Sequence, residues 1–105
     1  MAFSDVVSAM AALSFPVEFD HVKIGTHVPF GTYTFSVEPV SADNSVLIKR
    51  YQFTLRIFAE KLDAELDAEI EKMFSDLDIV WTRDEPEYDE DSETYEIDYD
   101  FGVIG

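Results

Sequence analysis

Two stretches in which apolar and polar residues alternate limit the possible folds of this chain more than any other feature. They cover residues 47–58 and 95–103, and their alternating apolar positions are Tyr51, Phe53, Leu55, Ile57, Tyr95, Ile97, Tyr99, Phe101 and Val103. Because successive side chains of a β-strand point to opposite sides of a sheet, this pattern predicts two long strands, each with one buried and one exposed face.

The spacing of the apolar residues changes between these two strands. They recur there every three or four positions, at Leu62, Leu66, Ile70, Met73, Phe74 and Leu77. This spacing, with acidic residues between the apolar ones, predicts an amphipathic helix of about four turns. A shorter helix is expected over residues 5–13, because Ser4 can cap its first turn and Asp5 complements its dipole.

The remaining elements are short, and together with the long ones they define a fold class. Further strands are predicted at residues 17–22, 33–38 and 79–83, and loops or turns at residues 23–31, 41–45 and 84–92. Runs of strands with segregated helices predict an α+β fold, with a mostly antiparallel β-sheet of four to five strands and two helices packed on one face. The length of 105 residues predicts a single domain, residues 1–105.

Negative charge is concentrated in the second half of the chain. The formal net charge is −16; residues 1–59 hold 5 acidic and 4 basic residues, whereas residues 60–105 hold 18 acidic and 3 basic residues. Because this charge repels phosphate groups, we expect neither nucleic-acid binding nor attachment to anionic membranes. Since the apolar stretches are short and the first residues lack the basic start of a signal peptide, a soluble intracellular protein is expected.

The sequence offers little that is typical of an enzyme. It has no cysteine, and the spacing of His21 and His27 matches no common metal-ligand pattern. The acidic segment from Glu85 to Glu93 lacks the pattern of a calcium-binding loop, so we expect at most weak, non-specific binding of divalent cations there. We therefore expect no catalytic residues, no cofactor and no specific metal site.

The polar faces of the two long strands carry opposite charges. If the strands pair, Arg50 and Arg56 lie near the acidic residues Glu96, Asp98 and Asp100, and each cross-strand ion pair contributes roughly 0.2–1 kcal/mol. The residues alone leave two interpretations of this face. It is either a solvated surface with partial charge balance, or a surface with surplus acid that lines a subunit contact or a channel.

The order and spacing of these features resemble the small tail-terminator proteins of long-tailed bacteriophages (siphoviruses), also described as tail-completion, head–tail joining or minor capsid proteins. The resemblance spans roughly residues 3–104. It is carried by the short N-terminal helix, Val28-Pro-Phe-Gly-Thr-Tyr33, the Ala42-Asp43-Asn44 turn, Tyr51-Gln-Phe-Thr-Leu-Arg-Ile-Phe58, Asp63-Ala-Glu-Leu-Asp-Ala-Glu-Ile-Glu71, the strand with the tryptophan, and Ser92-Glu-Thr-Tyr-Glu-Ile-Asp-Tyr-Asp-Phe101.

The resemblance implies a structural virion protein that forms a homo-oligomeric ring, expected to be a hexamer, at the head-proximal end of the tail. The ring would be part of the tail or neck of the virion and would assemble in the host cytoplasm. It would stop polymerisation of the tail tube, contact the tail tube protein and the head connector proteins, and let DNA pass through its lumen.

The resemblance also assigns roles to the charged residues. Because a lumen lined by carboxylates repels the DNA backbone, we expect Glu96, Asp98 and Asp100 to face it. Ring closure requires two different complementary surfaces, and the expected basic subunit contacts are Lys49, Arg50 and Arg56.

Two other functions remain open from the sequence. An acidic inhibitor that mimics DNA, of the anti-restriction or anti-CRISPR type, would present carboxylates at phosphate-like spacing and bind a basic DNA-binding protein without assembling with itself. A small metal-dependent enzyme built on the acidic segment would require specific binding of a divalent cation, which no ligand spacing in this chain supports.

Overall fold

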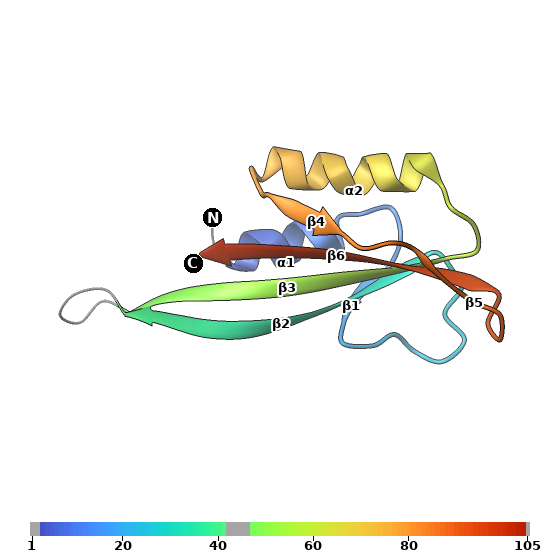
Figure 1. The fold of residues 1–105 in the computed structure, drawn as a ribbon, viewed down its shortest axis with the longest axis horizontal. Helices are drawn as coiled ribbons and strands as arrows, with labels where there is room; N and C mark the ends of the chain where they lie inside the picture. Colours follow the sequence, from blue (N-terminus) through green and yellow to red (C-terminus); the bar gives the residue numbers. More distant parts are fainter. Residues whose placement is uncertain (1–2, 42–46, 105) are drawn as a thin grey trace.

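The computed structural model describes residues 3–41 and 47–104. In these residues the elements are α1 (Phe3–Ala11), β1 (Val17–Phe19), β2 (Phe30–Ser41), β3 (Leu47–Ala59), α2 (Ala64–Asp76), β4 (Trp81–Arg83), β5 (Glu87–Asp89) and β6 (Thr94–Ile104) (Figure 1). The strands form one six-stranded sheet, against which the helices pack. The predicted α+β class is confirmed, with one strand more than expected.

The sheet is antiparallel except at one edge. Its strand order is β1-β2-β3-β6-β4, and β5 also pairs with β6. The two long predicted strands, β3 and β6, are neighbours, and Phe53 of β3 lies between Phe35 of β2 and Phe101 of β6. Only β1 runs parallel to its neighbour, β2. The expectation of a mostly antiparallel sheet is therefore confirmed.

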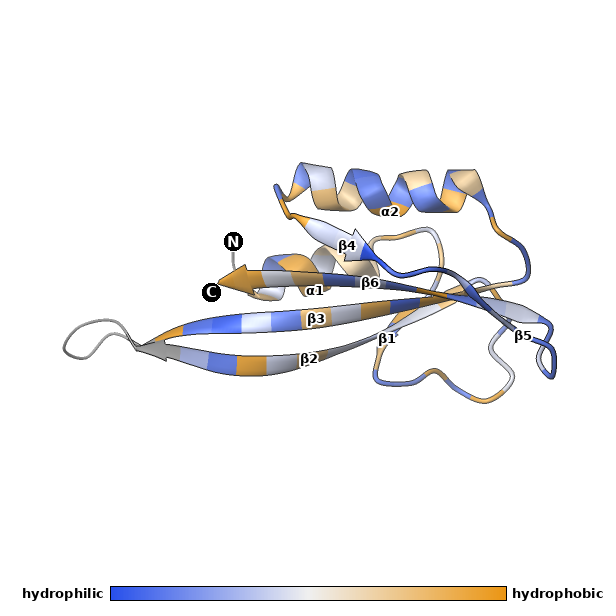
Figure 2. Ribbon diagram, viewed as in Figure 1, coloured by the Kyte–Doolittle hydropathy of each residue, from blue (hydrophilic) through white to orange (hydrophobic). Residues whose placement is uncertain are grey.

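One face of the sheet forms the core, because alternate residues of the long strands are apolar. Figure 2 shows hydrophobic and hydrophilic residues alternating along β3. The buried residues of β3 and β6 are Phe53, Leu55, Ile57, Ala59, Ile97, Tyr99, Phe101 and Val103. Full burial of a large apolar side chain contributes about 1.5–3 kcal/mol, so this face supplies much of the stability.

Both helices cover this same face of the sheet. The buried residues of the helices are Val6 and Met10 in α1 and Leu66, Ile70, Met73 and Phe74 in α2. The ring of Phe3 lies 5.5 Å from that of Phe53, and the ring of Phe74 lies 4.8 Å from that of Phe101. Because Phe53 and Phe101 are cross-strand partners on one face, the predicted packing of both helices on one side is confirmed.

The helices begin at other residues than the sequence pattern predicted. The carboxylate of Asp63 accepts a hydrogen bond of 2.9 Å from the N–H of Glu65 and caps α2. Leu62 therefore precedes the helix and is 52% exposed, so its expected place on the apolar helix face is wrong. At the other helix, α1 already begins at Phe3, so Ser4 lies within it and is not its cap.

The first strand is shorter than predicted. β1 ends at Phe19, and the following residue, Asp20, has a φ of 66°, which takes the chain out of the extended conformation. The residues predicted to continue the strand as far as position 22 therefore belong to the loop before β2.

The second strand is longer than predicted and passes through Pro39. The N–H of Gly31 donates to the carbonyl of Pro16, and the carbonyl of Tyr33 accepts from the N–H of Asp20. The main-chain groups of odd-numbered β2 residues therefore point to the β1 edge. Pro39 is odd-numbered, so its backbone nitrogen also faces the β1 edge. Because proline has no N–H there, the strand loses no hydrogen bond of the pairing with β3.

Two further predictions concern turns and loops. The acidic segment predicted as a loop at residues 84–92 contains a strand, β5, which pairs with residues 94–96. All three residues of β5 are exposed, so no apolar alternation could reveal it. The turn predicted at residues 41–45 lies, apart from Ser41, outside the described residues.

The molecule is elongated, with principal extents of 52 × 25 × 23 Å. The described part of β6 ends opposite Arg50, while β2 and β3 pair onward to Ser41 and Leu47. We call residues 38–41 and 47–50 the hairpin arm. Figure 1 shows that it extends beyond the helices at one end of the long axis.

Candidate functional site

The second face of the sheet is a polar surface that no helix in residues 3–41 and 47–104 covers, and we call it the open face (Figure 1). It is formed by the residues that alternate with the core residues. Those of β2, β3 and β6 include Thr34, Ser36, Glu38, Arg50, Gln52, Thr54, Arg56, Phe58, Glu96, Asp98 and Asp100.

Three acidic residues form a row on the open face. Glu96, Asp98 and Asp100 share this face because the buried residues Ile97 and Tyr99 alternate with them. The predicted common face of the three acids is therefore present, and their role as lining of a lumen stays a prediction.

The row of acids makes two contacts with β3. Oδ1 of Asp100 accepts a hydrogen bond of 2.8 Å from Oγ1 of Thr54. Oδ2 of Asp98 lies 3.9 Å from Nε of Arg56, so the structure brings Arg56 to the acids as the sequence predicted. Arg56 also donates from Nη1 to Oγ1 of Thr34, at 3.3 Å, which holds its guanidinium over the middle of the open face.

Arg50 does not join the acids of β6, and this part of the prediction is wrong. Arg50 lies opposite Ile104, and its Nη1 atom is 3.9 Å from Oε2 of Glu38 on β2. The register is the physical reason, because it places the last acid of the row, Asp100, opposite Thr54. Arg50 belongs instead to the hairpin arm.

Asp98 has an unusual electrostatic environment for a residue on an open sheet face. Its Oδ1 atom is buried and has no hydrogen-bond partner in the part of the chain that the structure describes. Burial raises the pKa of Asp98 to about 6; the neighbouring carboxylates of Glu96 and Asp84 raise it as well, whereas Arg56 lowers it. Asp98 is therefore partly protonated at mildly acidic pH, unlike an ordinary surface aspartate.

This raised pKa predicts an effect of the substitution Asp98→Asn that depends on pH. Between the ordinary aspartate pKa of 3.8 and about 6, the folded chain binds more protons at this residue than the unfolded chain, so the free energy of unfolding falls as pH rises through this window and stays lower above it. Asparagine carries no charge at any pH. We expect Asp98→Asn to raise the free energy of unfolding at pH 7.5 by about 1 kcal/mol and to have little effect at pH 4.

Urea denaturation at both pH values measures this effect. The exposed Asp91→Asn is the control, because it removes the same charge and reports the general effect of a lower net charge. A gain from Asp98→Asn that is no larger at pH 7.5 than at pH 4, after subtraction of the control, would contradict the expectation.

A polar cluster that the sequence analysis missed connects α2 to β4 and β6 on the covered side of the sheet. The hydroxyl of Tyr99 donates to Oδ1 of Asp67 at 3.2 Å, and Nη2 of Arg83 donates to Oδ2 of Asp67 at 3.2 Å. Burial raises the pKa of Tyr99 to about 12, so the hydroxyl keeps its proton and its role as donor. In the sequence, Asp67 looks like any other acid on the polar side of a helix.

The two histidines lie in the loop between β1 and β2. Nδ1 of His21 is 3.3 Å from Oδ2 of Asp20, and both side chains are largely exposed. Within residues 3–41 and 47–104, no group of three or more histidine, aspartate or glutamate side chains could hold a metal ion. Of the helices in this part of the chain, none has the length and apolar character needed to cross a membrane.

Comparison with known proteins gives a likeness in fold only. No protein-family profile and no curated protein matches the sequence. Among solved structures, 26 chains match. One belongs to the structure described as "Virion of native gene transfer agent (GTA) particle"; it is 13% identical, with a TM-score of 0.55, and the match covers 95% of this chain and 84% of that chain.

Proposed function

We propose that this chain is a structural virion protein of the tail-terminator type, which acts by assembling with other subunits. The observation that carries the proposal is the likeness in fold to a chain of a gene transfer agent virion, because it extends over 95% of this chain. The order of the sequence landmarks supports the same class independently. In this role the subunits form a ring at the head-proximal end of the tail, which stops the tube and joins it to the head.

The open face is the surface that we propose to face the DNA in the lumen. It is free of helices in the described chain and carries Glu96, Asp98 and Asp100 in one row. The guanidinium of Arg56 balances part of this charge, so the surface has surplus acid without being uniformly negative. Carboxylates close to a phosphate backbone repel it, which lets DNA slide without being held.

Native mass spectrometry of the purified protein across a range of concentrations tests the proposal. We expect discrete closed oligomers, with six subunits as the main species, and a ring in cryo-electron microscopy whose hole is lined by the open face. A ring with the open face on its outer surface would contradict the lumen assignment. A protein that stays monomeric and instead binds a basic DNA-binding protein in a salt-sensitive way would favour the DNA-mimic alternative.

A further inference from the structure

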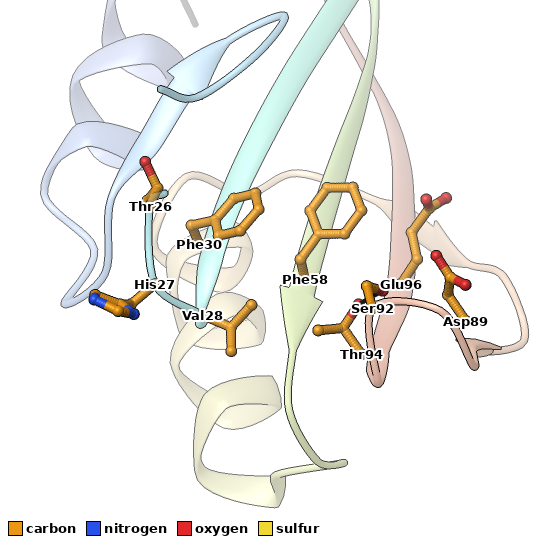
Figure 3. Close-up of a pocket in the computed structure, with 9 residues that line it drawn as sticks. All are labelled: Thr26, His27, Val28, Phe30, Phe58, Asp89, Ser92, Thr94 and Glu96. Carbon is orange, nitrogen blue, oxygen red and sulfur yellow. Dashed lines mark hydrogen bonds between the residues drawn. The ribbon is translucent and has the colours of Figure 1, made fainter. Parts of the chain in front are cut away.

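A groove of about 490 Å³ lies on the open face, at the end of the sheet opposite the hairpin arm (Figure 3). Phe30 of β2 and Phe58 of β3 are cross-strand partners within it, and their rings stack with centroids 5.0 Å apart and planes inclined by 25°. Figure 3 shows the loop before β2 on one side of these rings and the side chains of Asp89 and Glu96 on the other.

The chemistry of this groove suits a cationic side chain. The two phenyl rings are partly exposed on a face that is otherwise polar, and the face of an aromatic ring attracts a cation. The carboxylates of Asp89 and Glu96 add negative charge beside the rings. Within the residues that the structure describes, neither of these carboxylates forms an ion pair, so both can accept an ammonium or guanidinium group from outside.

The hairpin arm carries basic side chains that fit this description. Lys49 forms no ion pair in the described chain, and the contact of Arg50 with Glu38 is long, at 3.9 Å. Three other basic residues are already used in ion pairs of their own chain, namely Arg56, Lys72 and Arg83. In the described residues Lys23 and Lys61 also form no ion pair, but each lies in a loop without a basic neighbour in sequence. The arm is therefore where two adjacent basic residues can offer positive charge to a neighbour.

The positions of the arm and the groove allow them to meet only between two copies. They lie at opposite ends of a molecule that is 52 Å long (Figure 1). When the arm of each copy binds the groove of a different copy, the contact is heterologous, and its repetition closes a ring when the rotation allows it. Two antiparallel copies that bind each other's arms would instead form an isologous dimer.

We propose that the groove of one copy binds the hairpin arm of a second copy, with Arg50, on the open face of the arm, placed against Asp89, Glu96 and the two stacked rings. Lys49 lies on the opposite face of the arm and adds positive charge beside it. The arm then covers Glu96, the acid of the row that lies in the groove, and leaves Asp98 and Asp100 to face the lumen. This inference rests on the proposed function, because it names the contact through which the ring closes.

A charge swap between the two surfaces tests the contact. The arm variant, Lys49→Glu/Arg50→Gln, makes the arm negative. The groove variant, Asp89→Asn/Glu96→Lys, makes the groove positive and shifts the net charge by the same amount in the opposite direction. Asparagine at position 89 keeps a side-chain oxygen that can accept the hydrogen bond from the N–H of Asp91.

The swap has a specific expected result. Each variant alone should need at least about tenfold more protein than the wild type for half-maximal assembly in sedimentation velocity and native mass spectrometry, which corresponds to about 1.4 kcal/mol per contact. An equimolar mixture should recover wild-type assembly. Every contact in a ring that alternates the two variants joins a negative arm to a positive groove, or a positive arm to a negative groove.

A control variant separates this contact from general charge effects. Glu71→Lys/Asp78→Asn changes the net charge as the groove variant does, but near α2, away from the groove; Asp78 has a φ of 54°, which asparagine tolerates. This control should assemble at least as well as the wild type, because it lowers the repulsion between copies. Circular dichroism must show that all variants are folded.

The possible outcomes separate the inference from the proposed function. If the wild type forms a closed ring and both variants assemble as well as it does, the groove contact is overturned and the ring stands. The same holds if both variants are folded but their mixture does not recover wild-type assembly. Wild-type oligomers that are sensitive to the swap but do not close into rings support the contact and overturn the ring. A wild type that is monomeric at every concentration overturns both.

Discussion

Replacing Phe53 by alanine is expected to lower the free energy of unfolding by about 4 kcal/mol, because it removes a ring from the centre of the core. Phe53 is fully buried in the middle of β3. Its ring stacks on that of Phe101 at 5.0 Å and also contacts the rings of Phe3 and Phe35, both at 5.5 Å. Because these neighbours come from β6, α1 and β2, no single movement of the chain can fill the cavity.

The effect is measured by urea and thermal denaturation. For a domain of this size, each kcal/mol shifts the melting temperature by about 4–8 °C, so the variant should melt well below the wild type. Phe19→Ala is the matched control, because Phe19 belongs to the same aromatic cluster but is 54% exposed. It should change the free energy of unfolding by less than about 1 kcal/mol. Equal losses from both substitutions would show that the core is not centred on β3.

The substitution Asp67→Ala is expected to lower the free energy of unfolding by about 2 kcal/mol. It removes the acceptor of the hydroxyl of Tyr99, whose side chain is fully buried, and at the same time the ion-pair partner of Arg83. A buried donor without a partner costs more than the hydrogen bond itself contributes, because the hydroxyl cannot return to water. The ion pair with Arg83 is partly exposed and adds less.

A double-mutant cycle separates these two contributions. In a Tyr99→Phe background the buried hydroxyl is gone, so Asp67→Ala should cost markedly less than in the wild type. Glu71→Ala is the control, because Glu71 is an exposed acid one turn further along the same helix, and its removal should change the stability by no more than about 0.5 kcal/mol. If the effect of Asp67→Ala is the same in both backgrounds, its hydrogen bond to Tyr99 carries no stability.

The parts of the fold that the sequence predicted are those with a regular period. Side chains on a strand repeat every two residues, so the apolar residues of β3 and β6 define a buried face before any pairing is known. The same rule placed Glu96, Asp98 and Asp100 together on the opposite face. The helical spacing identified α2 equally well, since four of its predicted apolar residues are buried.

The parts that the sequence did not predict depend on contacts between distant segments. The alternation of apolar and polar residues shows which face of the sheet a residue occupies, but it does not show which residue of the neighbouring strand lies opposite. The register of β3 and β6 could therefore not be predicted, and Arg50 is opposite Ile104 instead of beside the acids of β6. β5 consists of exposed residues and exists through its pairing with β6. The groove of Phe30 and Phe58 likewise forms only because the loop before β2 and the turn after β5 come together. No pattern within a short stretch of sequence predicts this contact.

The place of β6 in the sheet has a consequence for how this chain folds during its synthesis. β6 follows every other strand in the sequence, yet it lies between β3 and β4 and supplies four buried residues of the core. While the chain is being synthesised, the hairpin of β2 and β3 can form early, since its strands are adjacent in sequence. Its apolar face has no partner on the β6 side until residues 94–104 have been made. The nascent chain therefore exposes the apolar face of this hairpin on the β6 side until β6 emerges from the ribosome, and the yield of folded protein falls if this surface aggregates first.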